Sequence, residues 1–311
     1  MVEHVFGGDW TKEKLNRVSK YLSAYVQILK DRDYHYSYID AFAGTGYVNS
    51  KLSVEDEQIE IFPELTEGEG KEFIEGSARI ALGVKPSFRQ YYFIDKDPKK
   101  ARDLERMKLD FPESHISVIS EDSNVFLKRF CKESDWRKQR AVIFLDPYGM
   151  QIPWTTIQDI ANTGGIDLWY LFPAGIAINR LLRRDGKISI KIKDRLNQTF
   201  GSTDWFDLFY QANQNLDLFG ENTIEYNKIA DLEDIKKYFI GRLKEVFHGG
   251  VAENPLWLVN SRNTPLYLLC FACSNRNVKS AVKIAQHVLE QPEKKQPSNK
   301  TTYPTIPGLN I

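Results

Sequence analysis

The 311-residue sequence has few cysteines, no long apolar run and no excess of charge of either sign. Three cysteines are too few for a disulfide framework, so we expect a protein of the reducing cytoplasm. No apolar stretch approaches the roughly 18 residues of a membrane helix, and residues 1–14 lack the apolar core of a signal peptide, so we expect neither. Lysine and arginine number 42, as do aspartate and glutamate, which argues against coating of nucleic acid by the whole surface. A balanced total charge is still compatible with local basic patches on the surface.

Two of the cysteines, Cys270 and Cys273, form a C-x-x-C pattern within the apolar stretch 266–273. A zinc site needs further cysteine or histidine ligands, and this stretch supplies none. We therefore expect both thiols to be core residues of a strand, and we expect no metal site.

What the sequence does contain is a regular alternation of short apolar strands and helices over its first 173 residues. We expect strands at 36–42, 91–94, 116–119, 141–145 and 166–172, and helices at 11–29, 77–82, 98–109, 123–131 and 154–161. Such alternation predicts a mostly parallel α/β sheet with helices on both faces. Two later strands, 256–260 and 266–273, predict an antiparallel hairpin that closes one edge of the sheet, before a helix at 278–289.

Insertions divide the predicted domain, which comprises residues 1–173 and 251–290. Residues 51–75 hold nine acidic side chains and few core candidates, so we expect a surface insertion there. Residues 174–250 are polar and helical in pattern without a convincing strand, which predicts a helical cover or substrate region. Residues 291–311 contain four prolines and predict a polar tail.

The first strand ends in a glycine-containing motif, Asp-Ala-Phe-Ala-Gly-Thr-Gly at 40–46. Glycines let the backbone approach a ligand closely, and ligands of open α/β sheets bind beyond the carboxyl ends of the strands. The missing third glycine of G-x-G-x-x-G counts against a dinucleotide fold. The pattern instead resembles motif I of amino-group methyltransferases, whose acid steers the methionine end of S-adenosylmethionine. This resemblance assigns the cofactor to Asp40, Phe42, Gly44, Thr45 and Gly46.

Acids also follow the second and third strands. Asp95 ends the second strand, and its two oxygens suit the two hydroxyls of a ribose, whereas Asp97 precedes Pro98 and suits a helix N-cap. Asp122, next to Ser123, follows the third strand. In class I methyltransferases an acid at this place accepts a hydrogen bond from the adenine amino group, so we assign both residues to the cofactor. The alternative for Asp122 is a cap of the next helix.

The fourth strand leads into Asp146-Pro147-Tyr148-Gly149. An exocyclic base amine is a weak nucleophile, and two acceptors, the Asp146 carboxylate and the Pro147 carbonyl, can grip its two N–H groups and direct its lone pair. Tyr148 can stack on a base that is unpaired or flipped out. The motif resembles the Asp-Pro-Pro-Tyr of N6-adenine and N4-cytosine methyltransferases, and more closely the Asp-Pro-Phe/Tyr-Gly of tRNA guanine dimethyltransferases. The alternative is a plain turn that Asp146 begins.

The one dense basic stretch lies at 180–195, which contains seven lysines and arginines and only two aspartates. It follows the fifth strand closely, near the mouth of the predicted site. We expect Arg180, Arg183 and Arg184 to hold substrate phosphates. A solvated helix face is the alternative.

Read together, residues 6–290 resemble the three-Cys-motif partner protein (TcmP) family. The resemblance is carried by the motifs above and by five further stretches: Phe-Gly-Gly-Asp-Trp-Thr at 6–11, Gly-Ser-Ala-Arg-Ile-Ala-Leu at 76–82, Trp-Arg at 136–137, Ile-Asp-Leu-Trp-Tyr-Leu-Phe-Pro at 166–173 and Asn-Arg-Leu-Leu at 179–182. It implies a bacterial or archaeal protein with a class I, Rossmann-like methyltransferase fold. It also implies a partner protein with a three-cysteine, iron–sulfur motif.

The combined prediction is a seven-stranded class I methyltransferase that uses S-adenosylmethionine and methylates an exocyclic amine of a nucleobase in DNA or RNA. One alternative is a cofactor-binding protein that is catalytically silent or acts only with its iron–sulfur partner. A second is an N-methyltransferase of small molecules or proteins, for which the acidic insertion would favour a cationic substrate. A third is a nicotinamide-dependent oxidoreductase, since Asp95 also suits that ribose.

Overall fold

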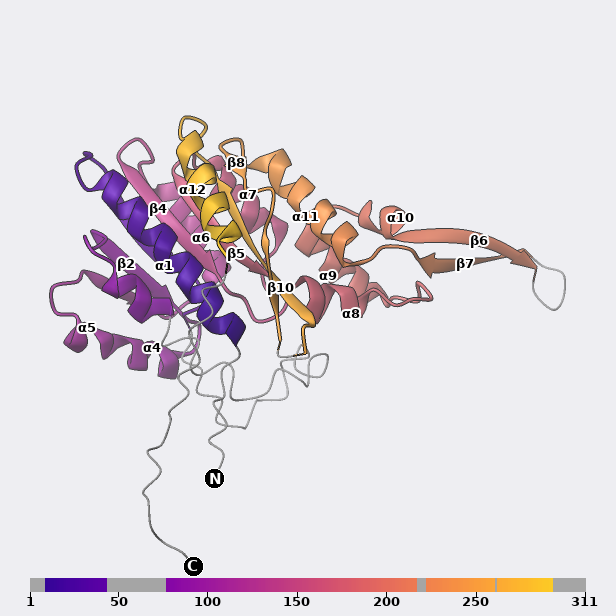
Figure 1. Cartoon of the computed structure of the whole chain (residues 1–311). Helices are drawn as coiled ribbons and strands as arrows, with labels where there is room; N and C mark the ends of the chain where they lie inside the picture. The colour runs from indigo at the N-terminus through magenta and orange to yellow at the C-terminus, as the bar shows by residue number, and fades with distance from the viewer. Residues whose placement is uncertain (1–8, 44–76, 217–221, 261, 293–311) are drawn as a thin grey trace, which may run out of the picture.

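The computed structural model describes residues 9–43, 77–216, 222–260 and 262–292 (Figure 1). Its centre is one sheet of eight strands in the order β3-β2-β1-β4-β5-β10-β8, with β9 paired to β10 as well. The strands are β1 (His35–Asp40), β2 (Gln90–Ile94), β3 (Ile116–Ile119), β4 (Gln139–Leu145), β5 (Ile166–Phe172), β8 (Gly250–Val251), β9 (Leu256–Val259) and β10 (Pro265–Cys273).

The first five strands are parallel, and β10 runs antiparallel to β5, β8 and β9. Strands β8 and β9 pair with different parts of β10, so they share one edge position and the sheet has seven positions. The predicted fold, a Rossmann-like, mostly parallel sheet of the class I methyltransferase type, is confirmed. So is the antiparallel hairpin of β9 and β10 at its edge.

Two hydrophobic layers enclose the sheet because its central strands are apolar on both faces. Along β4, Val142 and Phe144 pack into one layer, whereas Ala141, Ile143 and Leu145 pack into the other. The first layer is covered by α1 (Asp9–Leu29), α12 (Lys279–Glu290), α4 (Pro98–Glu105) and α5 (Met107–Asp110), and α1 lies beside α12 in Figure 1. The second is covered by α6 (Ser123–Glu133), α7 (Trp154–Asn162) and α11 (Leu232–Val246).

The prediction of a purely helical region at 174–250 is wrong. Helices are present, namely η1 (Ala174–Ile178), α8 (Asn179–Leu181), α9 (Ile190–Phe200), α10 (Trp205–Phe209) and α11. Between α10 and α11, however, β6 (Tyr210–Leu216) and β7 (Asn222–Lys228) form an antiparallel hairpin that projects from the body of the molecule (Figure 1). Its described side chains are largely exposed, so no core face forces apolar and polar residues to alternate along it.

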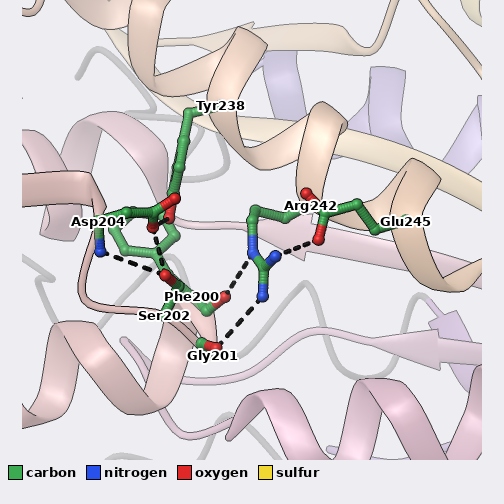
Figure 2. A network of polar contacts seen from close by, with 7 residues as sticks. All are labelled: Phe200, Gly201, Ser202, Asp204, Tyr238, Arg242 and Glu245. Carbon is green, nitrogen blue, oxygen red and sulfur yellow. Dashed lines mark hydrogen bonds and ion pairs between the residues drawn. The ribbon is translucent and has the colours of Figure 1, made fainter. Parts of the chain in front are cut away.

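A polar network joins α9, α10 and α11 (Figure 2); its members are Phe200, Gly201, Ser202, Asp204, Tyr238, Arg242 and Glu245. Arg242 donates to the carbonyl oxygens of Phe200 (3.1 Å) and Gly201 (3.2 Å) at the end of α9. Its guanidinium also lies 5.1 Å from the ring centroid of Trp154 in α7. A cation that binds the last carbonyls of a helix satisfies otherwise unpaired acceptors, so α11 fixes the end of α9 against α7.

Three further predictions concern the cysteines, the acidic segment with the tail, and membrane helices. Cys270 and Cys273 are buried in β10, so their prediction as core residues is confirmed. The acidic segment 51–75 and residues 293–311 of the tail lie outside the described residues. Within the described ranges, no helix is long and apolar enough to cross a membrane.

Gly201 tests the attachment of α9 to α7. It has φ +66°, and a Cβ placed on it would lie 2.1 Å from the Trp154 ring. Gly201→Ala should therefore lower the free energy of unfolding by about 2–4 kcal/mol, through backbone strain and overpacking. Urea denaturation measures this change.

Gly241→Ala is the matched control, because Gly241 lies within α11 and its added Cβ meets nothing within 4 Å. That variant should be neutral or more stable by up to about 1 kcal/mol, since alanine is the better helix former. Equal stability of both variants would contradict the proposed close packing of Gly201 on Trp154.

Candidate functional site

Three of the predicted acids meet at one edge of the sheet. Asp40 is the last residue of β1, while Asp95 and Asp146 directly follow β2 and β4, the two neighbours of β1. Asp40 lies in register with Phe93 and Phe144, so all three acids lie within two residues of the same level. The carboxyl edge of a parallel sheet is where open α/β folds bind ligands.

Asp40 is almost fully buried, at 1% exposure. Its carboxylate accepts hydrogen bonds from the Ser77 hydroxyl (2.8 Å) and from the Phe42 amide (3.4 Å). Burial raises the pKa of Asp40 to about 7, and the negative charge of Asp146 acts in the same direction, against the hydrogen bond from Ser77. Both donors hold the start of the loop after β1; the predicted Gly44, Thr45 and Gly46 lie outside the described residues.

Asp95 and Asp97 follow β2, and the structure confirms the role predicted for Asp97. Asp97 caps α4, accepting from the Lys99 amide at 2.8 Å, so the predicted cap is confirmed. Asp95 accepts from the Asp97 amide at 2.7 Å, and Lys100 Nζ lies 4.0 Å from Asp95 Oδ2. Burial raises the pKa of Asp95, against the hydrogen bond from the Asp97 amide. A role of Asp95 at a ribose stays a prediction.

Asp122 and Ser123 form the start of α6. Asp122 Oδ1 accepts from the amides of Asn124 (2.9 Å) and Val125 (3.2 Å), so the capping role weighed for it is present. Ser123 is buried and its hydroxyl donates to the carbonyl of Ala41, which ties α6 to the loop after β1. Both residues therefore shape the edge of the site, and their contact with adenine stays a prediction.

Asp146 has a partner that the sequence prediction missed. Lys14 Nζ of α1 lies 3.5 Å from Asp146 Oδ2, and the two side chains are 1% and 15% exposed. Burial raises the pKa of Asp146, and the ammonium of Lys14 acts against that rise. Burial likewise lowers the pKa of Lys14 to about 8, against the attraction of Asp146. Helical spacing could have indicated that Lys14 is buried, because it lies four residues before the buried Val18 and therefore on the same face of the helix.

The turn after Asp146 presents Tyr148 at the surface, with 38% of the residue exposed, while Pro147 is buried. Gly149 has φ +65°, which suits glycine and lets the chain turn sharply there. Asn124 donates from its side chain to the Gln151 carbonyl at 3.1 Å, so α6 supports this turn. Tyr148 is thus accessible beside Asp146, and its stacking role stays a prediction.

The predicted phosphate contacts are solvent-facing. Arg180 lies in α8, and Arg183 and Arg184 lie in the loop before α9. All three are exposed, and Arg183 pairs with Asp185 through two hydrogen bonds of 3.2 Å. This segment continues from β5 at the carboxyl edge of the sheet, but the Asp185 pair offsets part of its charge.

No protein-family model and no curated protein matches the chain. Among solved structures, LPL1258 of Legionella pneumophila str. Philadelphia 1 is 15% identical, with TM-score 0.38 over 78% of this chain and 94% of its own. A proposed rRNA methylase of Clostridium thermocellum is 13% identical, with TM-score 0.29 over 67% and 95%. The 23S rRNA methyltransferase ErmE is 12% identical, with TM-score 0.25 over 88% and 98%.

Every one of these TM-scores lies below 0.5, so the likenesses carry no argument about activity. The fold assignment rests on the strand order and direction of the sheet itself. The resemblance to the TcmP family stays a prediction.

The buried carboxyl of Asp40 makes stability depend on pH. Its pKa is about 7 in the folded chain and near 4 when unfolded, so only the folded state keeps the proton between those values. The stability that this proton contributes is present below about pH 4 and lost as pH rises through 7. Asp40→Asn, which stays neutral, should gain up to about 4 kcal/mol over the parent between pH 4 and pH 8.

Chemical denaturation at both pH values measures the gain. Asp33→Asn is the control, because Asp33 is exposed and its replacement should give a constant difference. A constant difference for Asp40→Asn as well would contradict the burial of Asp40 as an acid.

Proposed function

We propose that this chain is an S-adenosylmethionine-dependent methyltransferase that acts on an exocyclic amine of a nucleobase in DNA or RNA. The observation that carries the proposal is the meeting of Asp40, Asp95 and Asp146 at adjacent strand ends, with Asp146 leading into an exposed tyrosine. A class I sheet with this set of acids offers positions for both the cofactor and an acceptor amine. Two features together favour a methyltransferase over a dinucleotide-binding protein: the strand order of the sheet and the missing third glycine of the G-x-G-x-x-G pattern.

The cofactor side of the proposal concerns β1 and β2. Asp40 and Phe42 begin the loop that would lie along the methionine end of the cofactor, and Asp95 would accept hydrogen bonds from the ribose. Asp122 and Ser123 at the start of α6 would border the adenine. The residues fit such a group, since Asp95 retains 10% exposure of its side chain at the edge where ligands bind. When bound, the cofactor supplies an electrophilic methyl group on a cationic sulfur.

The acceptor side concerns the turn after β4. The carboxylate of Asp146 and the carbonyl of Pro147 would accept the two N–H groups of the amine, which directs the nitrogen lone pair out of conjugation with the ring. Tyr148 would stack on the base and hold it in the site. Because the methyl group is already activated, positioning and charge arrangement supply most of the catalysis, without a metal ion.

A nucleic-acid substrate is supported by the exposed Arg180, Arg183 and Arg184, which follow β5 at the same edge of the sheet. Exposed guanidinium groups bind phosphates through paired N–H donors. The ion pair of Arg183 with Asp185 lowers the net attraction of the Arg183 guanidinium for a phosphate.

One observation favours a second candidate, a cofactor-binding protein without catalysis. Asp146, the residue that would hold the amine, already binds a buried lysine. In that case the chain would serve an iron–sulfur partner of the kind that the TcmP resemblance implies. The role of Asp146 decides between the two candidates.

Asp95→Ala tests the cofactor proposal. Loss of a charged acceptor for two ribose hydroxyls should weaken S-adenosylmethionine binding by about 1.5–3 kcal/mol, or roughly 10- to 150-fold in Kd. Calorimetry of the parent and the variant measures the difference, with NAD expected to bind the parent much more weakly. Asp97→Ala is the control, since loss of the α4 cap should lower stability and leave the affinity unchanged. Equal affinity of Asp95→Ala and the parent would remove Asp95 from the ribose.

Asp146→Ala tests catalysis. If the carboxylate acts mainly in the transition state, methyl transfer should fall by orders of magnitude while cofactor affinity stays near that of the parent. Tyr148→Ala should weaken substrate binding by about 1–3 kcal/mol, and Tyr148→Phe should retain most of it. Single-turnover methylation of RNA and DNA and thermal melting are measured on the same samples.

A variant of Asp146 that melts lower without any change in methylation would favour a plain turn. No methylation of RNA or DNA by the parent, with an iron–sulfur partner present, would overturn the enzyme proposal.

A further inference from the structure

Lys14 reaches the candidate site from a part of the chain that no site motif includes. It lies in the first half of α1, on the face that packs on the sheet, and its residue exposure is 0%. Its Nζ lies 3.5 Å from Asp146 Oδ2 and 5.9 Å from the centroid of the Phe144 ring. Lysine is rarely buried to this degree unless its charge meets a partner, so the contact with Asp146 requires an explanation.

The charges around Asp146 come from two elements. From β1, burial raises the pKa of Asp40 to about 7, and burial together with the charges of Asp40 and Asp146 raises the pKa of the Tyr38 hydroxyl. From α1, Lys14 supplies a positive charge. Among the described residues, Lys14 is the cation that acts on Asp146, and it opposes the rise in pKa that burial causes.

The chemistry of the proposed reaction requires that offset. A protonated carboxylic acid donates a hydrogen bond through its hydroxyl, whereas a carboxylate only accepts. Both N–H groups of the acceptor amine need acceptors, so a protonated Asp146 would misdirect the amine. A buried acid tends to take up a proton unless a nearby cation opposes it.

We infer that Lys14 is a positioning residue for Asp146, which it keeps ionised and orients by binding Oδ2, so that Oδ1 is left for the acceptor amine. Within the described residues, Oδ1 of Asp146 accepts no hydrogen bond. The inference rests on the proposed function for its purpose, and on the geometry of Lys14 and Asp146 for its physical content.

A purely structural role, in which Lys14 fastens α1 to the sheet, is the competing explanation. Other contacts already perform that task. Arg17 donates to the Val288 carbonyl at 2.6 Å, and Tyr21 donates to Asp167 of β5 at 2.6 Å. These two bonds attach α1 to α12 and β5 independently of Lys14.

Lys14→Met, which keeps the length of the side chain without its charge, is the first test. The carboxyl titration of Asp146, followed by NMR of isotope-labelled aspartate and assigned with Asp146→Asn, should move up by about 1–3 pH units. The acid limb of single-turnover methyl transfer should move with it, and the rate should recover at high pH. Lys14→Arg should retain the parent titration.

The matched control is Lys20→Met, which removes a charge from the same helix. Lys20 binds the side chain of Gln291 at 2.6 Å, so its loss should leave the Asp146 titration unchanged. A reciprocal measurement covers poor folding of Lys14→Met. In Asp146→Asn, with Lys14 intact, the titration of Lys14 should move below its parent value of about 8.

An Asp146 titration that is the same in Lys14→Met and the parent would overturn the inference, whatever the activity. A Lys14 titration that does not respond to Asp146→Asn would do so too. A shifted titration in a protein that methylates nothing would support the hold of Lys14 on Asp146 and would overturn the proposed function instead.

Discussion

The pairing of buried opposite charges between α1 and the end of β4 is the constraint on which the candidate site depends. Asp40 ends β1 and Asp146 directly follows the neighbouring β4, and both are largely buried on the face that α1 covers. A carboxylate in such a place loses its hydration, so a nearby cation stabilises it. Among the described residues, the cation that lies against Asp146 is Lys14, on the helix that also covers this face of the sheet. The charge balance at Asp146 therefore depends on the packing of α1 on the sheet.

The sequence predicts the strand ends well because each is a local pattern. Apolar runs such as that of β4 are buried on both faces, and the acids that follow them lie at one edge by the geometry of parallel strands. The cap at Asp97 follows from its position before Pro98, which is again a local relation. Asp122 is a case in which the local pattern does not decide the role. Its carboxylate suits both a helix N-cap and a contact with the cofactor, and the sequence does not distinguish the two.

Long-range contacts and exposed strands are the parts that sequence reasoning misses. Lys14 and Asp146 are 132 positions apart, and a lysine near an apolar helical stripe reads as its solvated border. The described side chains of the β6–β7 hairpin are largely exposed, so its sequence does not show the alternation of apolar and polar residues that marks a strand. The bond from Ser123 to the Ala41 carbonyl also escapes prediction, because it depends on how closely α6 approaches the loop after β1.

The helices η1, α9, α10 and α11 of the region after β5 belong to the same hydrophobic core as the sheet. The ring of Phe172 in β5 stacks on that of Phe239 in α11, with centroids 3.6 Å apart, and residues of η1, α9 and α10 continue the same cluster. Rigid-body motion is the usual expectation between domains that meet through a small polar interface, but not across a shared apolar core. A large opening of this region would expose that core to water, so it is strongly disfavoured. In the proposed function, a substrate at the carboxyl edge would therefore meet a backbone that this shared core holds in place.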